Sequence, residues 1–215
     1  MRILVACEES QAVTIELRKL GHEAYSCDIE ECSGGHSEWH LQTDVTELLK
    51  MKWDMIIAFP PCTYLSNAGA CRLYPTKGNI DNDRYQKGLK AKEFFMLFYN
   101  ADCERIVIEN PVQSKVFNMP KYTQIIQPYE HGHPYSKKTC LWIKGLPMLQ
   151  PTNIVTDNII SWVSGGSKDN HGNARKNKGT KHRDSKTKSK TFPGIAKAMA
   201  EQFTNNSINK SKNML

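Results

Sequence analysis

The sequence predicts an α/β fold in which a mostly parallel sheet carries helices on both faces. Short apolar runs, typical of buried strands, alternate along the chain with segments of helical periodicity, as expected for right-handed βαβ crossovers. The 215 residues and the 39% apolar share are enough for one such domain with an elaborated loop. No internal repeat is visible.

The first half of the chain begins this alternation. Strands are predicted at residues 2–7, 23–28 and 53–59, and a short helical piece at 44–50. Between the first two strands, residues 9–20 are predicted to form an amphipathic helix. Its apolar face consists of Val13, Leu17 and Leu20. Gly21 follows where a glycine is common just past a helix end.

The middle of the chain contains a loop and a second long helix. Residues 67–88 are polar and rich in Gly, Asn and Pro, which predicts a loop. Residues 88–99 are predicted to follow as a packed helix. Its apolar face consists of Leu89, Phe94, Leu97 and Phe98.

The second half adds further strands and a closing helix. Strands are predicted at residues 105–109, 122–127, 139–143 and 159–163. A final helix at 192–203 presents Ile195, Met199 and Phe203 on one face. Residues 205–215 have little apolar surface to bury and are expected to fray.

Two predicted strands deliver reactive side chains to the same edge of the sheet. The strand at 53–59 leads into Pro60-Pro61-Cys62, and the strand at 105–109 leads into Glu109-Asn110-Pro111. Open α/β folds keep their ligands at the carboxyl ends of the strands. A thiol beside an acid there suggests covalent catalysis on an electron-poor ring. The alternatives are a buried structural thiol and a salt-bridged strand end.

The turn after the first strand constrains the cofactor. Cys7-Glu8-Glu9-Ser10-Gln11 contains no glycine, so close approach of a dinucleotide pyrophosphate is disfavoured. A nucleoside cofactor without phosphates remains open. Asp28 lies about twenty residues into this unit, where a carboxylate can bind ribose hydroxyls. A turn or a helix cap is the alternative role for Asp28.

The seven cysteines are scattered without tight CxxC pairs, which favours reduced thiols over a disulfide framework. Cys27, Cys32, His36 and His40 form a spaced series that raises the alternative of a zinc site. Their spacing matches no common structural zinc site well, so a strand-end and loop segment is the favoured interpretation.

Positive charge is concentrated in one segment. Residues 164–190 contain nine Lys or Arg and two Asp, a local charge of +7 that equals the net charge of the chain. Such a segment is typical of phosphate binding, and a solvated linker is the alternative. With no signal-like start and no apolar stretch approaching a membrane span, we expect a soluble cytoplasmic protein, in host cytoplasm if a virus encodes it.

These motifs resemble, in order, those of the DNA (cytosine-5) methyltransferases, most closely compact versions encoded by viruses of bacteria. In that family Pro-Cys carries the nucleophile, matching Pro61-Cys62, and Glu-Asn carries the acid, matching Glu109-Asn110-Pro111. Segment 132–145 resembles a later motif of the family, and 192–196 resembles its last helix beside the cofactor pocket. The resemblance spans residues 1–203.

The resemblance implies a Rossmann-like fold and methylation of cytosine carbon 5 in DNA, using S-adenosylmethionine. Addition of a thiolate to carbon 6 makes carbon 5 nucleophilic, and an acid at ring nitrogen 3 assists the addition. Cys62 would need a depressed pKa, from backbone amides, basic neighbours or the sulfonium of the cofactor. Burial would keep Glu109 protonated. The expected partner is duplex DNA with the target cytosine flipped out.

The resemblance also assigns roles to individual residues. The implied catalytic residues are Cys62, Glu109 and Lys137. The implied cofactor-binding residues are Cys7, Glu8, Asp28, Ile29, Asp44, Val45, Pro60, Phe192 and Gly194. The implied substrate-binding residues are Pro61, Asn110, Lys176, Lys181 and Arg183, and no metal is expected. His131, His133 and Tyr135 either line the pocket or serve in ordinary packing.

The same resemblance divides the chain into four parts. These are a catalytic core at 1–150, a short basic DNA-contacting insertion at 151–190, a final helix returning to the core at 191–205, and a disordered tail at 206–215. About 44 residues separate Pro147 from the last helix. Full-length relatives keep a larger target-recognition region there, so this insertion is reduced and we expect short or relaxed sequence specificity.

Departures from the family motifs keep other functions open. The first turn lacks glycine, and Lys137 and Thr139 stand where the family has arginines, which weakens a bidentate clamp. A catalytically inactive nucleic-acid-binding protein with this fold is one alternative, and the same chemistry on RNA or a free nucleotide is another. Amino-group methyltransferases are disfavoured, because they need Asp or Asn at the position of Phe59 and an aromatic residue at that of Cys62.

Overall fold

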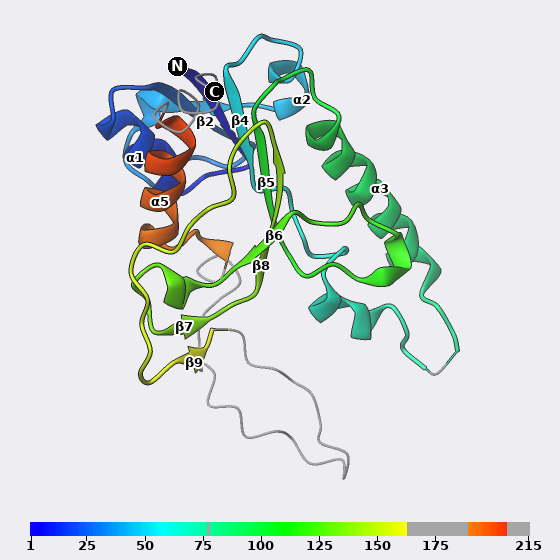
Figure 1. Cartoon of the computed structure of the whole chain (residues 1–215). Coiled ribbons are helices and arrows are strands. Elements are labelled where there is room, and N and C mark those ends of the chain that lie inside the picture. The colour runs from blue at the N-terminus through cyan, green and yellow to red at the C-terminus, as the bar shows by residue number, and fades with distance from the viewer. Residues whose placement is uncertain (77, 163–188, 206–215) are drawn as a thin grey trace, which may run out of the picture.

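A seven-stranded sheet forms the centre of the computed structural model, which describes residues 1–76, 78–162 and 189–205 (Figure 1). The strand order is β3-β2-β1-β4-β5-β8-β6. The first five strands in this order are parallel, whereas β8 runs antiparallel to both β5 and β6. The predicted Rossmann-like α/β fold with a mostly parallel sheet is confirmed.

The strands of this sheet are β1 (Arg2–Ala6), β2 (Glu23–Asp28), β3 (His40–Gln42), β4 (Met55–Ala58), β5 (Ile106–Pro111), β6 (Gln124–Ile126) and β8 (Thr139–Lys144). A separate pair consists of β7 (Tyr135–Ser136) and β9 (Ile160–Ser161). The α-helices in the described ranges are α1 (Ala12–Lys19), α2 (Val45–Leu48), α3 (Asn82–Tyr99) and α5 (Pro193–Thr204). Short 3-10 helices are η1 (Ser37–Trp39), η2 (Asn67–Arg72), η3 (Lys115–Phe117) and η4 (Pro128–Glu130).

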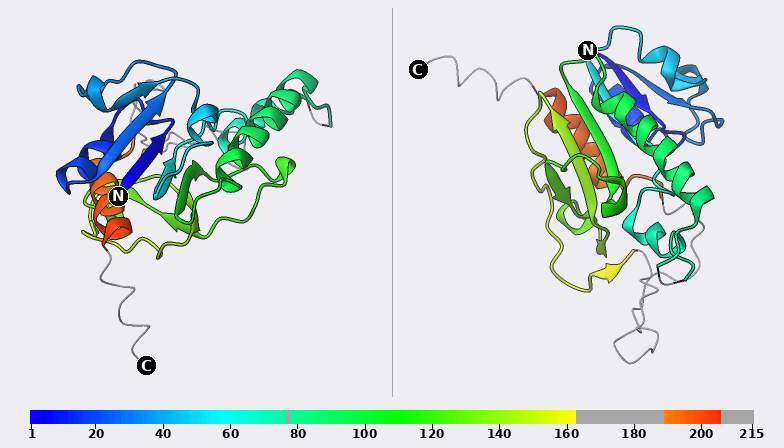
Figure 2. Two further views of the ribbon diagram at one scale, coloured as in Figure 1. Left: turned by 90° about the horizontal axis from the view of Figure 1, so that it is seen from above. Right: turned by 90° about the vertical axis from the view of Figure 1, so that its right-hand side faces the viewer.

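The parallel strands are apolar throughout because both faces of the sheet are covered. Successive residues of a strand point to opposite faces. Ile3 and Val5 of β1 therefore belong to the core shared with α1 and α5, whereas Leu4 and Ala6 belong to the core shared with α3. Two views confirm that α1 and α5 lie side by side on one face and α3 on the other (Figures 1 and 2).

The helices α1 and α5 pack against each other through the faces that the sequence predicts, with one exception. Val13 and Leu17 of α1 are fully buried, but Leu20 is 45% exposed, so its predicted place on the apolar face is wrong. Gly21 has a φ of 79°, the left-handed conformation expected just past a helix end. In α5, the predicted face of Ile195, Met199 and Phe203 is buried.

The start of α3 differs from the prediction. The helix begins at Asn82, where the carboxylate of Asp81 accepts a hydrogen bond of 3.0 Å from the backbone N–H of Arg84. Gly88 therefore lies inside the helix rather than at its start. A Cβ at this position would collide with the ring of Phe117, which explains why the residue is glycine. The glycine is thus a packing contact, and the loop predicted to reach residue 88 is shorter.

The buried face of α3 and two strands were also mispredicted. Phe95 is fully buried, whereas Leu97, placed on the apolar face from the sequence, is 44% exposed. The strands β3 and β7 were not predicted because they are short and largely polar. Residues 163–188 and 206–215, which include most of the basic segment and of the predicted tail, lie outside the described ranges.

Membrane insertion through a helix has no support in the described part of the chain. No helix there combines the length and apolarity that a membrane-spanning segment requires.

Candidate active-site cleft

A cleft of about 880 Å³ follows the carboxyl ends of the parallel strands. It is lined by the segments that follow β1, β2, β3, β4 and β5, by Lys137, and by residues 189–191 just before α5. Most of the residues singled out from the sequence lie here: Cys7, Glu8, Asp28, Ile29, Asp44, Val45, Pro60, Pro61, Cys62, Glu109, Asn110 and Lys137. The fold therefore brings together twelve predicted site residues that are spread over more than half of the chain.

The loop that carries Cys62 is held in a tight turn directly after β4. Pro60 and Pro61 lack backbone N–H groups and cannot extend the strand pairing. The carbonyl oxygen of Cys62 accepts hydrogen bonds from the backbone N–H groups of Leu65 at 3.1 Å and Ser66 at 2.9 Å. The thiol is partly exposed and lines the cleft. This geometry presents Cys62 to a ligand rather than burying it in the core.

Arg84 of α3 fixes the outer part of the same loop. Its Nη2 donates to the carbonyl oxygen of Thr63 at 3.1 Å and to that of Gly69 at 3.4 Å. The guanidinium also lies 5.0 Å from the ring centroid of Tyr64. The position of this arginine depends on tertiary structure, so sequence reasoning missed it.

The Cys62 loop is bonded to the end of β5 and to the segment that follows it, which sets the relation between the two reactive side chains. Asn110 Nδ2 donates to the carbonyl oxygen of Pro60 at 2.7 Å, and Asn110 Oδ1 accepts from Gln113 Nε2 at 2.6 Å. The backbone N–H of Ser114 also donates to the carbonyl oxygen of Leu65 at 2.8 Å. Asn110, implied as a substrate-binding residue, thus uses its buried amide to hold the loops together.

The electrostatics of the cleft favour a protonated Glu109. Burial raises the pKa of this carboxyl, while the ammonium of Lys137 and a hydrogen bond with the side chain of Thr139 lower it. The balance is a raised pKa, as the sequence predicts for an acid at an apolar strand end. This direction favours the protonated form of Glu109, which is the form that can donate a hydrogen bond to a ring nitrogen.

The pKa of the Cys62 thiol is raised, whereas the sequence leads us to expect a depressed pKa. Burial raises its pKa, nearby Glu109 raises it further, and Lys137 lowers it. The net direction is upward, so the expected depression of the Cys62 pKa is not produced by the chain alone. Lys137 acts in the expected direction on the thiol, and desolvation exceeds its effect.

The turn after β1 adopts left-handed backbone conformations, which glycines usually provide, although it contains no glycine. Cys7 has a φ of 58° and Gln11 a φ of 56°, both in the left-handed region that costs a residue with a side chain about 1–2 kcal/mol. Gln11 is fully buried. Its side chain donates to Ser26 Oγ at 3.1 Å and to the carbonyl oxygen of His36 at 2.8 Å, and accepts from the His36 N–H at 3.0 Å. These bonds stabilise the strained turn.

Glu8 has a structural role that differs from the implied cofactor contact. Its buried carboxylate accepts hydrogen bonds from the backbone N–H of Val13 at 2.7 Å, the N–H of Thr14 at 3.2 Å and Thr14 Oγ1 at 2.8 Å. It therefore caps α1, which has no side-chain cap at its N-cap residue. Burial is the main cause that raises the pKa of Glu8 to about 7.

The carboxylates of Asp28 and Asp44 and the apolar side chains of Ile29 and Val45 line the end of the cleft formed by β2 and β3. Asp28 Oδ1 accepts a hydrogen bond from the backbone N–H of Glu30 at 3.0 Å, so the turn role and a place in the cleft coexist. Asp44 caps α2, and its hydrogen bonds with Thr46 lower its pKa. Ile29 is 76% exposed at the rim, an apolar surface suited to a flat ring.

Phe192 and Gly194, implied as cofactor-binding residues, do not line the cleft. The ring of Phe192 packs against Tyr135 and Trp162, with centroid distances of 5.8 and 4.6 Å. Gly194 lies against the carbonyl oxygen of His131, where a Cβ would collide, and its N–H donates to His133 Nε2 at 3.0 Å. These residues seat α5, and residues 189–191 reach the cleft in their place.

His131, His133 and Tyr135 make packing contacts, the alternative to lining the pocket. His131 Nδ1 lies 3.1 Å from Thr152 Oγ1. The other two residues contact Gly194 and Phe192 at the start of α5. Lys176, Lys181 and Arg183, the implied DNA contacts, lie outside the described residues.

Three of the four residues of the alternative zinc series, namely Cys27, His36 and His40, have other partners. Cys27 donates to the carbonyl oxygen of Thr43, and His40 bonds with Ser26 and with the carbonyl oxygen of Glu30. His36 stacks on Trp39 with a centroid distance of 3.9 Å. In the described ranges, no group of three or more His, Cys, Asp and Glu side chains is placed to hold a metal ion.

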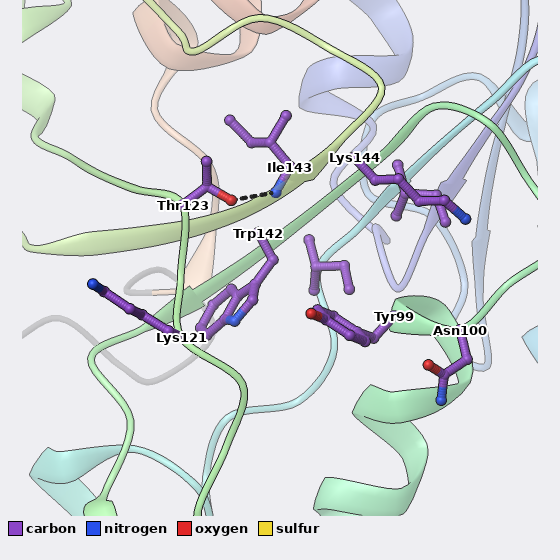
Figure 3. A pocket seen from close by; sticks show the side chains of 9 residues that line it. Tyr99, Asn100, Lys121, Thr123, Trp142, Ile143 and Lys144 are labelled. Carbon is purple, nitrogen blue, oxygen red and sulfur yellow. Dashed lines mark hydrogen bonds between the residues drawn. The ribbon is translucent and has the colours of Figure 1, made fainter.

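A second cleft, of about 540 Å³, lies between the end of α3 and the strands β5 and β8, toward the opposite edge of the sheet (Figure 3). Its floor includes Trp142, and Lys121 and Lys144 stand at its rim. The lining residues include neither a carboxylate nor a thiol. Of the two clefts, the one that holds Cys62 combines a thiol with carboxylates.

Comparison with known proteins finds similarity at the level of structure alone. No family model and no curated protein matches the chain. Among solved structures, a candidate DNA modification methyltransferase encoded within a prophage (E. coli) matches 74% of the chain with 16% identity and a TM-score of 0.44. The Entamoeba histolytica methyltransferase EhMeth matches 71% with 12% identity and a TM-score of 0.46. A mutant of Spodoptera frugiperda DNMT2 matches 72% with 15% identity and a TM-score of 0.37.

The chain corresponds to 52%, 57% and 54% of these three structures, so it spans about half of their length. With identities and TM-scores this low, the function of the chain is inferred from its own cleft.

Proposed function

We propose that this protein is an S-adenosylmethionine-dependent DNA cytosine-5 methyltransferase that works through a transient bond between Cys62 and the pyrimidine. The observation that carries the proposal is the meeting of Cys62, Glu109 and Lys137 in one cleft, with Asp28 and Asp44 further along it. A nucleophile and an acid with a raised pKa face one end, and groups suited to a nucleoside face the other.

The residues of the cleft fit the proposed cofactor. Asp28 can bind ribose hydroxyls, and Ile29, Val45 and the backbone at Asp44 can enclose the adenine. Oε2 of Glu9 is buried without a hydrogen-bond partner among the described residues, so this end of the cleft offers an acceptor to a ligand. When bound, the cofactor supplies a methyl group made electrophilic by its sulfonium.

In the proposed reaction, the side chains at the tips of β4 and β5 act on the base. Cys62 Sγ adds to carbon 6, which breaks the ring's carbon 5–carbon 6 double bond and makes carbon 5 nucleophilic. Glu109 hydrogen-bonds ring nitrogen 3 and stabilises the negative charge that the addition creates. Lys137 stabilises the thiolate. After methylation, the carbon 5 proton passes to solvent, the bond between Cys62 Sγ and carbon 6 breaks, and the carbon 5–carbon 6 double bond forms again as the thiolate departs.

Duplex DNA is the proposed substrate because of the basic segment. A base can reach Cys62 only after it leaves the stack. Lys176, Lys181 and Arg183 are proposed to contact phosphates, which positions the duplex without reading its sequence. The small size of this segment is the reason to expect relaxed sequence specificity.

Trapping with 5-fluorocytosine tests the proposal. Fluorine at carbon 5 blocks the final elimination, so the protein incubated with S-adenosylmethionine and fluorinated duplex DNA is expected to give a denaturation-resistant adduct. Cys62→Ser should abolish the adduct. Cys32→Ser, at a partly exposed thiol outside the cleft lining, is the matched control and should retain it. An adduct that survives in Cys62→Ser would contradict the proposal.

The raised pKa of Cys62 favours one alternative, a nucleic-acid-binding protein without catalysis. Salt-sensitive DNA binding without adduct or methyl transfer would support that alternative. The same trapping experiment with fluorinated RNA and with the free nucleotide separates the remaining substrates.

A further inference from the structure

The turn after β1 places a carboxylate with an unused oxygen in the cleft. The side chain of Glu9 is only 15% exposed, and its Oε1 lies 3.9 Å from Lys190 Nζ. Its Oε2 is buried and has no hydrogen-bond partner in the described ranges. Because a buried carboxylate oxygen is unfavourable without a donor, this atom indicates a partner that brings donor hydrogens and positive charge.

Lys190 provides the opposite charge at the same place. Its Nζ donates to Ser33 Oγ at 3.0 Å, and the backbone N–H of Ser33 donates to the carbonyl oxygen of Glu9 at 2.8 Å. Residues 189–191 line the cleft together with Glu9 and Ser10. A cation and an anion, held next to each other by Ser33, therefore face the same ligand volume.

The strand order fixes where this charged pair lies along the cleft. In the order β3-β2-β1-β4, Asp44 follows β3, Asp28 is the last residue of β2, and Cys62 follows β4. Glu9 follows β1, which lies between β2 and β4. The pair is thus placed between the end suited to a nucleoside and the end that holds the reactive thiol.

The shape of the proposed cofactor assigns a ligand group to this position. Its sulfonium carries three substituents, of which the ribose is directed to Asp28 and the methyl to the base at Cys62. The third substituent is a chain that ends in an α-ammonium and a carboxylate, and the tip of β1 is the place left for it. At this tip the backbone N–H of Glu8 already donates to the carbonyl oxygen of Cys27 at 3.1 Å, so it does not serve the cofactor.

We propose that Glu9 and Lys190 clamp the zwitterionic α-amino-acid end of the cofactor. Glu9 accepts hydrogen bonds from the ammonium through Oε2, and Lys190 pairs with the carboxylate. Side chains thereby replace the glycine-rich backbone that the turn lacks. This inference rests on the proposed function, since it names the residues that hold one end of the same cofactor.

Calorimetric titration with three adenosine thioethers tests the clamp without any measurement of activity. S-adenosylhomocysteine carries the full amino-acid end, its decarboxylated form keeps only the ammonium, and 5′-methylthioadenosine has neither group. Glu9→Gln is expected to weaken S-adenosylhomocysteine about tenfold to a hundredfold, the usual range for a hydrogen bond to a charged group. It should leave 5′-methylthioadenosine within about twofold. Lys190→Met should weaken S-adenosylhomocysteine but not its decarboxylated form.

Controls are a second Glu–cation pair and a second lysine, both outside the cleft lining. Glu23→Gln, at a carboxylate 3.9 Å from Arg2, and Lys52→Met, at a lysine paired with Asp102, should change no affinity. Retained binding of 5′-methylthioadenosine also shows that each variant is folded.

The outcomes separate the clamp from the proposed function. If Glu9→Gln weakens all three ligands equally, the pair only holds residues 189–191 in place, and the clamp is wrong. An unchanged affinity for S-adenosylhomocysteine also overturns it, while the cofactor site stands. If the wild-type protein binds none of the three ligands, the proposed function fails and the clamp fails with it.

Discussion

The turns after β1 and after β4 lie on neighbouring strands of one sheet edge, yet they are held in different ways. The turn after β1 is stabilised by its own side chains, since Glu8 caps α1 and Gln11 bonds to the loop around His36. The turn after β4 is stabilised from outside, by Asn110 of β5 and Arg84 of α3. Neighbouring turns with different supports should respond differently to substitution.

The comparison teaches where stability and chemistry separate. Substitution of Gln11, in the turn after β1, removes buried hydrogen bonds and should lower the free energy of unfolding. Substitutions of Cys62 and Glu109, at the tips of β4 and β5, remove groups that face the cleft and should lower the rate instead. Each prediction below would sharpen that division or break it.

The largest expected effect is at Glu109. Glu109→Gln keeps the shape of the side chain but removes its acidic proton, so methyl transfer should fall about 10²- to 10⁴-fold, the usual range for general acid–base groups. The free energy of unfolding should be nearly unchanged. Transfer of a labelled methyl group to DNA measures the rate, and Glu93→Gln on the exposed side of α3 is the control. Activity within about tenfold of wild type would contradict the assigned role.

The second prediction concerns pH and the turn after β1. Burial raises the pKa of Glu8 from 4.5 to about 7 in the folded protein. The folded state therefore binds the proton more tightly than the unfolded state. Stability from Glu8 is full below pH 4.5 and is lost as the pH rises to about 7. Because one pKa unit corresponds to ~1.4 kcal/mol, the loss is up to about 3 kcal/mol.

Urea unfolding of wild type and Glu8→Gln across this pH range measures the effect. The difference in unfolding free energy between the two proteins isolates Glu8 from the other acids. It should change in favour of the variant as the pH rises. A constant difference would show that the hydrogen bonds from Val13 and Thr14, rather than burial, dominate at this carboxyl.

The third prediction separates hydrogen bonding from backbone strain at Gln11. Gln11→Ala leaves the buried partners at Ser26 and His36 without their bonds and should cost about 2–3 kcal/mol in unfolding free energy. Gln11→Gly loses the same bonds but relieves the φ of 56°, so it should cost about 1 kcal/mol less than Gln11→Ala. Equal losses in the two variants, measured by denaturant unfolding, would show that the turn is not strained.

The smallest expected effect is a shift in the titration of Cys62. Lys137 lowers the pKa of this thiol and Glu109 raises it. In Lys137→Ala the pH midpoint of iodoacetamide alkylation at Cys62 should rise, and in Glu109→Gln it should fall. Mass spectrometry of the Cys62 peptide follows the reaction. The control is Lys138→Ala, because Lys138 is next to Lys137 but lowers the pKa of Cys140 rather than that of Cys62. It should leave the pH midpoint of Cys62 alkylation unchanged.

Features of the fold and the cleft that depend on neighbouring residues could be predicted from the sequence, whereas features that depend on contacts between distant segments could not. Apolar runs that end in Pro-Cys or Glu-Asn locate β4, β5 and the reactive side chains, since a strand and its tip are local in the chain. The roles of Arg84, Asn110 and Gln11 are set by contacts between distant segments, so no local pattern reveals them. The family resemblance implies a cofactor contact for Glu8, whereas its bonds to α1 cannot be read from its neighbours in the sequence.

The helix boundary at Gly88 illustrates the same limit. A glycine after a polar stretch favours a loop by propensity, and the loop prediction followed from that. The ring of Phe117, which packs where a side chain would stand, reverses the preference. Tertiary packing thus decides a position that local preference assigns wrongly.

The pairing of α1 with α5 has a consequence for synthesis on the ribosome. On the ribosome, Val13 and Leu17 emerge long before Met199 and Phe203, their partners in the same core. Until α5 has been synthesised, this part of the core is incomplete, a state prone to association with other chains. Its completion is a long-range event, because it joins segments that lie far apart in the sequence.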